Sequence, residues 1–227
     1  LDFATDLRRG DVYFLMDTTA SMDDEIAALA RDIAGTIVPG VRMRVPDAEL
    51  GVGSFEDYPA LGHGGTGDVP YLPIAAVSSD DAATIAGVGT LALGIGGDRP
   101  ECTLSAIHAA ITGVALDWPE PPLGDLGYDP HPVPAAAPAC SAGRFGYACF
   151  RPDAVPIFVV VTDAPFHNDP VVPAADYSFP APTYAETLAA LAARHARVVW
   201  VDSGDATSRA AGTRLTTDTG ALDETGA

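Results

Sequence analysis

A carboxylate and two hydroxyls follow directly after a short apolar run near the start of the sequence. The run is residues 12–16 (VYFLM), and the polar side chains are Asp17, Thr19 and Ser21. Oxygen ligands of this kind suit Mg²⁺, Ca²⁺ or Mn²⁺ and not soft metals. The spacing therefore predicts a loop that holds a hard divalent cation.

Two later segments offer oxygens that would complete such a site. The loop 98–101 contributes a carboxylate, and Asp163 follows the second strongly apolar run, residues 157–161 (IFVVV). Mg²⁺ binds six oxygens and usually keeps several waters. We expect the loop to add a direct ligand and Asp163 to anchor a bound water, which leaves one position for a carboxylate from outside the chain.

The elements that must position these residues alternate between strand and helix. This order predicts an α/β fold with a Rossmann-like, doubly wound, mostly parallel sheet, one antiparallel edge strand and helices on both faces. Uninterrupted apolar runs are typical of central parallel strands. The expected strands are residues 12–16, 50–55, 71–77 (the antiparallel strand), 157–161 and 198–201. Because ligands bind beyond the carboxyl ends of such strands, we expect Asp17 and Asp163 to converge.

Helices are predicted where apolar residues recur at three- and four-residue steps. The first is expected over residues 23–37, with Pro39-Gly40 ending it. Ser78 or Ser79 is expected to cap the second. This second helix is expected to end near residue 88. Three further helices are predicted over residues 104–115, 184–195 and 206–216.

The length of 227 residues and an apolar content of 48% indicate one domain with an ample core. We expect an N-terminal linker at residues 1–9 and a single domain over 10–227, with a surface insertion rich in Pro, Gly and Ala at about 117–156. Cys140 and Cys149 flank a glycine-rich turn there and are predicted to form a disulfide, which is typical of oxidising compartments.

The net charge of −19 and pI of about 4.2 argue against binding to nucleic acids or anionic membranes. No apolar run is long enough to insert into a membrane. All 12 basic residues are arginine, and with the many Ala, Gly and Pro this indicates GC-rich coding and a bacterial source. The chain begins at Leu1, so we expect it to be part of a longer, secreted or cell-surface protein.

Together the three loops resemble a von Willebrand factor A domain, and most closely the A-like domain of integrin β subunits. The stretch 17–22 (DTTASM) is similar to the D-x-S-x-S motif that opens the family's metal-ion-dependent adhesion site, with Thr19 keeping the hydroxyl. The stretch 98–101 (DRPE) is similar to the integrin D-x-P-E loop, and 162–164 matches the family's T-D-A. The resemblance implies Glu101 as the direct ligand, with Thr103 as the fallback.

Integrin β chains also carry two flanking cation sites, and the resemblance implies residues for both. Asp24 and Glu25 would form the first, with the Ser21 carbonyl. The second would use Asp57, Asp98 and the Pro100 carbonyl, although Gly96 stands where the family usually has an asparagine. The implied cofactors are Mg²⁺ at the adhesion site, with Mn²⁺ or Ca²⁺ as substitutes, and Ca²⁺ at the flanking sites.

The function that this resemblance implies is non-enzymatic: cation-dependent binding of an Asp or Glu carboxylate on a protein partner. Other functions stay open from the residues alone. The chain could be the A-domain subunit of an intracellular chelatase or ATPase assembly, a metal-dependent hydrolase with His167 as general base, or a structural module. The five histidines show no zinc-binding spacing, and His167 is expected to pack beneath the metal loops. The family's last helix is not evident after Asp223.

Overall fold

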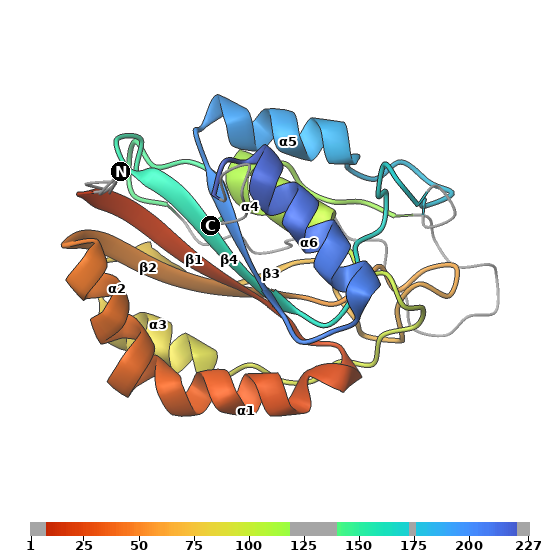
Figure 1. Ribbon diagram of the computed structural model, residues 1–227, viewed down its shortest axis with the longest axis horizontal. Coiled ribbons are helices and arrows are strands. Elements are labelled where there is room, and N and C mark those ends of the chain that lie inside the picture. The colour runs from red at the N-terminus through yellow and green to blue at the C-terminus, as the bar shows by residue number, and fades with distance from the viewer. Residues whose placement is uncertain (1–7, 119–139, 173–175, 222–227) are drawn as a thin grey trace.

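A five-stranded sheet in the order β3-β2-β1-β4-β5 forms the centre of the computed structural model, which describes residues 8–118, 140–172 and 176–221 (Figure 1). Neighbouring strands pair in parallel except β3, which is antiparallel to β2 at one edge. The strands are β1 (Arg9–Asp17), β2 (Asp47–Phe55), β3 (Leu72–Ser78), β4 (Val155–Thr162) and β5 (Arg197–Asp202). The predicted α/β, Rossmann-like class is confirmed.

Helices cover both faces of the sheet (Figure 1). One face carries α1, α2 and α3, and the other carries α4, α5 and α6. Their bounds are α1 (Asp23–Asp32), α2 (Val38–Arg44), α3 (Asp81–Val88), α4 (Thr103–Thr112), α5 (Tyr184–Ala193) and α6 (Ala206–Asp218), with a 3₁₀ turn η1 (Ala20–Met22) and a π-helical turn η2 (Ile33–Ile37).

Strand β1 supplies apolar side chains to both helical layers. Tyr13 and Leu15 are fully buried on the side of α4, and Val12, Phe14 and Met16 are buried among α1, α2 and α3. Each such side chain contributes roughly 1.5–3 kcal/mol by leaving water. Burial on both faces is what the unbroken apolar run predicts, and it fixes where β1 delivers Asp17.

The first helical segment continues past the stop that the sequence predicts. Pro39 lies in the first turn of α2, and the helical path ends at Arg44. Pro is tolerated in a first turn because the amide hydrogen it lacks has no partner there. The π-helical turn η2 separates α1 from α2 and so allows this placement. The predicted end at Pro39-Gly40 was wrong for that reason. Asp80, rather than a serine, caps α3 through its side chain.

Residues 140–154, which lie within the predicted insertion, are anchored in the core through Ala148, Cys149 and Phe150. Phe150 is fully buried and packs edge-on against Phe158 at a ring distance of 5.4 Å. The predicted disulfide between Cys140 and Cys149 is present. The residues from 119 to 139, which make up most of the predicted insertion, lie outside the described residues.

An ion pair fixes this segment at the amino-terminal end of the sheet. Asp11 has no solvent exposure, and its carboxylate accepts hydrogen bonds from Arg151 N at 2.6 Å and Arg151 Nε at 2.7 Å. Arg151 also donates to Asp47 at 2.8 Å, which lies at the start of β2. Arg151 therefore joins the segment to β1 and β2.

The ends of the chain lie largely outside the described residues. Of the predicted linker, residues 1–7 are not described, and Arg9 already belongs to β1, where it pairs with Asp47 at 2.6 Å. Residues 222–227 are likewise not described. None of the helices in the described ranges has the length and apolar character that a membrane span requires.

Candidate metal centre

The loops after β1 and β4 meet at the carboxyl edge of the sheet, as the sequence predicts for Asp17 and Asp163. Thr162, the last residue of β4, donates a hydrogen bond from Oγ1 to Asp17 Oδ2 at 2.6 Å. Both side chains are fully buried. Asp163 comes next in the chain and is half-buried, with a carboxylate close enough to Asp17 to act on its pKa.

Asp17 also holds the hydroxyl that follows it. Its Oδ1 accepts hydrogen bonds from Thr19 N at 2.9 Å and from Thr19 Oγ1 at 2.7 Å. Thr19 Oγ1 in turn lies 3.4 Å from Ser21 Oγ. Asp17 therefore holds the Thr19 hydroxyl, and the Ser21 hydroxyl lies next to it. The three predicted oxygen ligands of this segment are brought together.

Glu101 reaches the same place from a different loop. Its amide donates to Pro165 O at 2.9 Å and its carbonyl accepts from His167 N at 3.0 Å, so its backbone pairs with the segment after β4. A Cβ built on Gly96 would lie 3.3 Å from Thr19 Cβ and 3.8 Å from Glu101 Oε1. Thr19 and the Glu101 carboxyl therefore both lie beside Gly96.

The electrostatics of Glu101 are those of a carboxylate without a counter-ion. Its side chain is 4% exposed, and Oε2 accepts no hydrogen bond within the described part of the chain. Burial, and then the nearby carboxylates led by Asp17, raise its pKa to about 12. Burial also raises the pKa of Asp17, to about 6. Only a cation or bound protons can balance this charge.

A small cavity of about 310 Å³ opens beside these residues. The chain supplies five polar or charged side chains to it besides Glu101, and Arg99 is the one base among them. It is lined by Ser21, Asp98, Arg99, Glu101, Asp163, Ala164, Gly204 and Asp205. Arg99 and Asp205 form an exposed ion pair at 2.7 Å. The cavity borders the exposed Ser21 and the largely buried side chain of Glu101.

The other predicted ligands are less closely connected to this group. Asp24 and Glu25 lie in the first turn of α1, where Asp24 is exposed and Glu25 is half-buried. The hydrogen bonds of the Asp17 carboxylate in the described ranges go to Thr19 and Thr162, not to either of these residues. Thr103 begins α4 with its Oγ1 buried and without a hydrogen-bond partner in the described ranges. Pro100 lies between Asp98 and Glu101 in the same loop.

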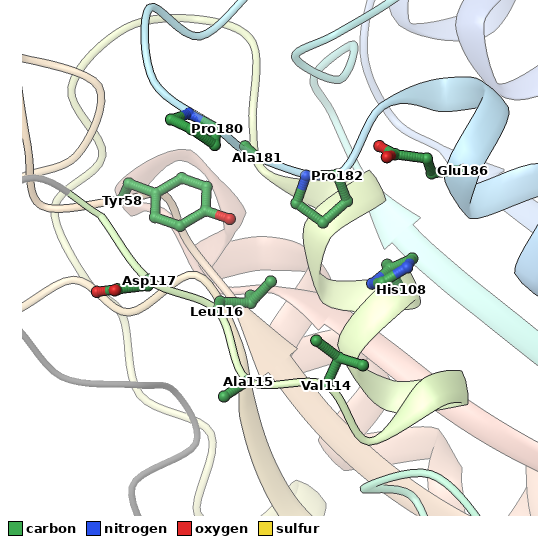
Figure 2. A pocket seen from close by; sticks show the side chains of 10 residues that line it. All are labelled: Tyr58, His108, Val114, Ala115, Leu116, Asp117, Pro180, Ala181, Pro182 and Glu186. Atoms are coloured by element: carbon green, nitrogen blue, oxygen red, sulfur yellow. The ribbon is translucent and has the colours of Figure 1, made fainter.

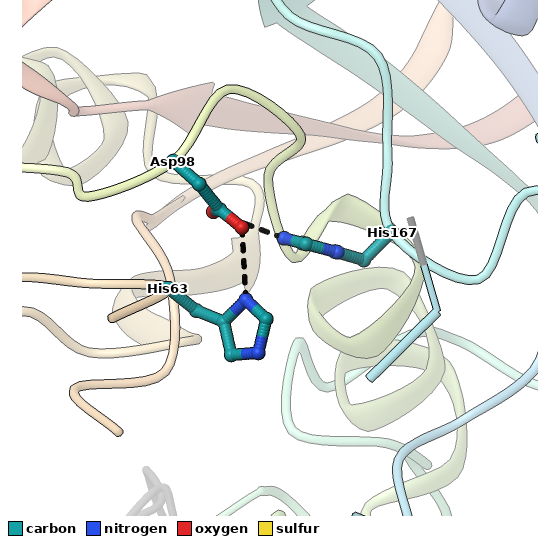
Figure 3. A group of neighbouring side chains, drawn as sticks. All are labelled: His63, Asp98 and His167. Carbon is teal, nitrogen blue, oxygen red and sulfur yellow. Dashed lines mark hydrogen bonds and ion pairs between the residues drawn. The ribbon is translucent and has the colours of Figure 1, made fainter. Parts of the chain in front are cut away.

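Next to the Glu101 loop, His63, Asp98 and His167 form a group that could hold a metal ion (Figure 3). Their ligand atoms lie within 4.8 Å of one another. His63 Nδ1 is 2.9 Å from Asp98 Oδ2, and His167 Nε2 is 3.2 Å from Asp98 Oδ1. Asp57, predicted as a ligand with Asp98, places Oδ2 3.2 Å from the same His167 nitrogen.

A larger cavity of about 350 Å³ lies between the end of α4 and the start of α5, and contains none of the predicted ligands (Figure 2). His108 and Glu186 face it from these helices, and Tyr58 and Leu116 line the other side (Figure 2). Glu186 is committed to the N-cap of α5, where Thr183 and Glu186 bond reciprocally. The lining of this cavity is mostly apolar, and none of the metal-binding groups found among the described residues lies in it.

No model of a known protein family matches the chain, and no curated protein matches it either.

His63 is a potential ligand that the sequence did not predict. It lies in the glycine-rich turn after Asp57, 104 positions before His167 (167 minus 63), so no local spacing connects the two. One pattern could have indicated the pair. His63 follows β2 and His167 follows β4, and the loops after parallel strands lie at the same edge of the sheet.

Proposed function

We propose that the chain is a von Willebrand factor A-type module that binds a carboxylate of a protein partner through a divalent cation, Mg²⁺ in the first place. Thr19, Ser21 and Glu101 would be the direct ligands. Asp17 and Asp163 would bind through water. The observation that carries the proposal is the buried Glu101 Oε2, which has no hydrogen-bond partner in the described ranges and faces several other carboxylates.

The residues present fit such an ion in number and type. Hydroxyl and carboxylate oxygens are the ligands of Mg²⁺, and buried acids that repel one another are neutralised by a divalent charge. The Thr19 hydroxyl donates a hydrogen bond to Asp17 Oδ1, so it is already oriented before any ion binds. When bound, the cation supplies a charge-assisted bond to an outside carboxylate.

The cavity beside Ser21 would admit the partner's acidic side chain. Arg99 is ion-paired to Asp205 on the surface, and exposed pairs of this kind contribute little stability. Exchange of Asp205 for a carboxylate of the partner would therefore cost little. Arg99 would offer a second contact to the same group.

Binding is a better proposal than hydrolysis because of where His167 points. A metal-dependent hydrolase needs a general base beside the attacking water. His167 Nε2 instead contacts Asp57 and Asp98, at 3.2 Å each, and the side chain is 2% exposed. The disulfide is typical of oxidising compartments, which supports a secreted or cell-surface location over an intracellular chelatase or ATPase assembly.

The test uses Mg²⁺ alone and then immobilised peptides. EDTA should lower the melting temperature of the purified chain and Mg²⁺ should restore it. Asp17→Ala and the milder Ser21→Ala, at an exposed position, should weaken the restoration. Arrays of peptides with a central Asp or Glu should retain the protein with Mg²⁺ but not with EDTA, and their Asn and Gln counterparts should not. Mg²⁺ responses that are equal in the wild type and both variants would refute the site, and retention independent of Mg²⁺ would refute the binding mode.

A further inference from the structure

We propose that His63, Asp98 and His167 form a second metal centre that takes an ion of the Zn²⁺ class, separate from the oxygen-lined Mg²⁺ site at Asp17. The predicted flanking site at Asp57 and Asp98 contained only oxygen ligands and suited Ca²⁺. The structure adds two imidazoles to it, which changes its chemistry. Imidazole nitrogen is a favoured ligand of Zn²⁺ and its transition-metal neighbours and a poor one of Mg²⁺ or Ca²⁺.

The distances between the ligand atoms already suit such an ion. Bonds of about 2.0–2.1 Å in a tetrahedral arrangement place ligand atoms roughly 3.4 Å apart. His63 Nδ1 and His167 Nε2 lie 2.9 and 3.2 Å from the two oxygens of Asp98. Figure 3 shows both rings directing a nitrogen at this carboxylate. Only small movements would be needed to surround an ion.

Asp57 provides a fourth ligand atom, a carboxylate oxygen. Its side chain is fully buried, and its Oδ2 lies 3.2 Å from His167 Nε2. Its other oxygen accepts a hydrogen bond from the Tyr177 hydroxyl. This contact fixes the carboxylate in the manner of the outer partners that orient metal ligands. Two carboxylates and two neutral imidazoles would give an uncharged complex with a divalent ion.

Aromatic packing holds the two imidazoles in position. The His167 ring lies 4.1 Å from the Tyr177 ring, tilted by 32°, and the His63 ring meets Tyr177 edge-on at 4.8 Å. The backbone is held as well, because Asp98 N donates to His63 O at 3.1 Å. The ligands are therefore organised before an ion binds.

Access to the centre is from the Asp98 side. The side chain of Asp98 is 39% exposed, that of His63 is 16% exposed, and that of His167 is 2% exposed. An ion could thus enter without unfolding of the surrounding loops. A bound ion would tie the Asp98 loop, which also carries Glu101, to the loops of His63 and His167.

The experiment titrates the full chain, after treatment with a chelator, with ZnCl₂ in isothermal titration calorimetry and with Co²⁺ in visible absorption spectroscopy. We expect one Zn²⁺ per chain and d–d absorption bands typical of a four-coordinate Co²⁺ site. His63→Ala and His63→Gln should each weaken Zn²⁺ binding by at least about tenfold. His195→Asn is the matched control, because His195 is an exposed histidine with φ of 54°, a conformation that Asn tolerates, and this variant should bind like the wild type.

The same titration separates this centre from the Mg²⁺ site. Glu101→Gln should keep Zn²⁺ binding while losing the Mg²⁺ effect on melting temperature, and His63→Ala should do the reverse. Absence of Zn²⁺ binding to the wild type, or full binding by both folded His63 variants, would overturn the second centre. In that case His167 serves only as a polar contact between Asp57 and Asp98. Loss of the Mg²⁺ effect alone would leave the second centre standing.

Discussion

Glu101→Gln is the most informative single substitution, because the protonated acid and the amide have nearly the same shape. With a pKa of about 12, Glu101 is protonated at pH 7 in the metal-free protein. The variant should therefore melt close to the wild type in EDTA. What it lacks is the negative charge that would hold a cation.

The magnitude follows from mass action. At a Mg²⁺ concentration 100 times the wild-type Kd, binding stabilises the fold by about 2.7 kcal/mol. For a chain of this length that corresponds to a rise in Tm of roughly 5–10 °C. If loss of the carboxylate weakens Mg²⁺ binding about 100-fold, the same concentration gives the variant only about 0.4 kcal/mol, or roughly 1 °C.

The assay is differential scanning calorimetry over a Mg²⁺ series at pH 6, 7 and 8. The wild-type affinity should rise with pH, by up to about tenfold per unit for each proton released, since Glu101 must lose its proton to bind. The pH dependence of the variant should be shallower. Asp153→Asn, an exposed acid at the opposite edge of the sheet, is the control and should respond like the wild type. The reasoning is falsified if Glu101→Gln keeps the full wild-type rise in Tm.

Three further predictions concern stability. Burial raises the pKa of Glu56 from 4.5 to about 7, so folded Glu56 binds more protons than unfolded Glu56 between these values. Its contribution to the free energy of unfolding in EDTA should therefore fall, by on the order of 2 kcal/mol, as pH rises through this window. Asp17 and Glu101 add falls of the same sign, so Glu56→Gln should make the profile from urea titrations less steep by the Glu56 share alone. Reduction of Cys140–Cys149 should lower the free energy of unfolding by about 3 kcal/mol, and an unchanged urea midpoint in dithiothreitol would contradict this. Arg151→Ala should cost about 3–5 kcal/mol because it leaves the buried Asp11 unpaired, whereas an equally large loss in Arg151→Ala and in Asp11→Asn/Arg151→Ala would show that the buried charge is not the cause.

The sheet could be predicted because its central strands are apolar on both faces. Residues 12–16 and 157–161 lie in the two parallel strands β1 and β4, and the convergence of Asp17 with the loop after β4 follows from that pairing. The edges of the elements were less predictable. The helix continues past Pro39 because of a π-helical turn, and no local sequence pattern predicts such a turn. Phe150 was placed in a surface insertion because its proline- and glycine-rich surroundings hide its contact with Phe158.

The two candidate centres differ in how many of their ligands could be predicted from the sequence. The ligands at Asp17 lie two and four residues apart in one loop, so local spacing was informative. The group at Asp98 brings together residues from three loops, and only the fold places His63 beside His167. Whether Glu101 and its neighbours bind a cation stays a prediction, since the geometry supports it and the titrations above test it.

The short pairing between Glu101 and the segment after β4 has a consequence for how this protein can change over time. Glu101 offers its side chain to the first centre, and its backbone carbonyl accepts a hydrogen bond from the amide of His167, a ligand of the second centre. A substitution that displaces this stretch would disturb both centres at once, so the stretch is doubly constrained under selection. Ser21 and His63 lie outside it, and they are the positions at which an engineer could adjust one centre without altering the other.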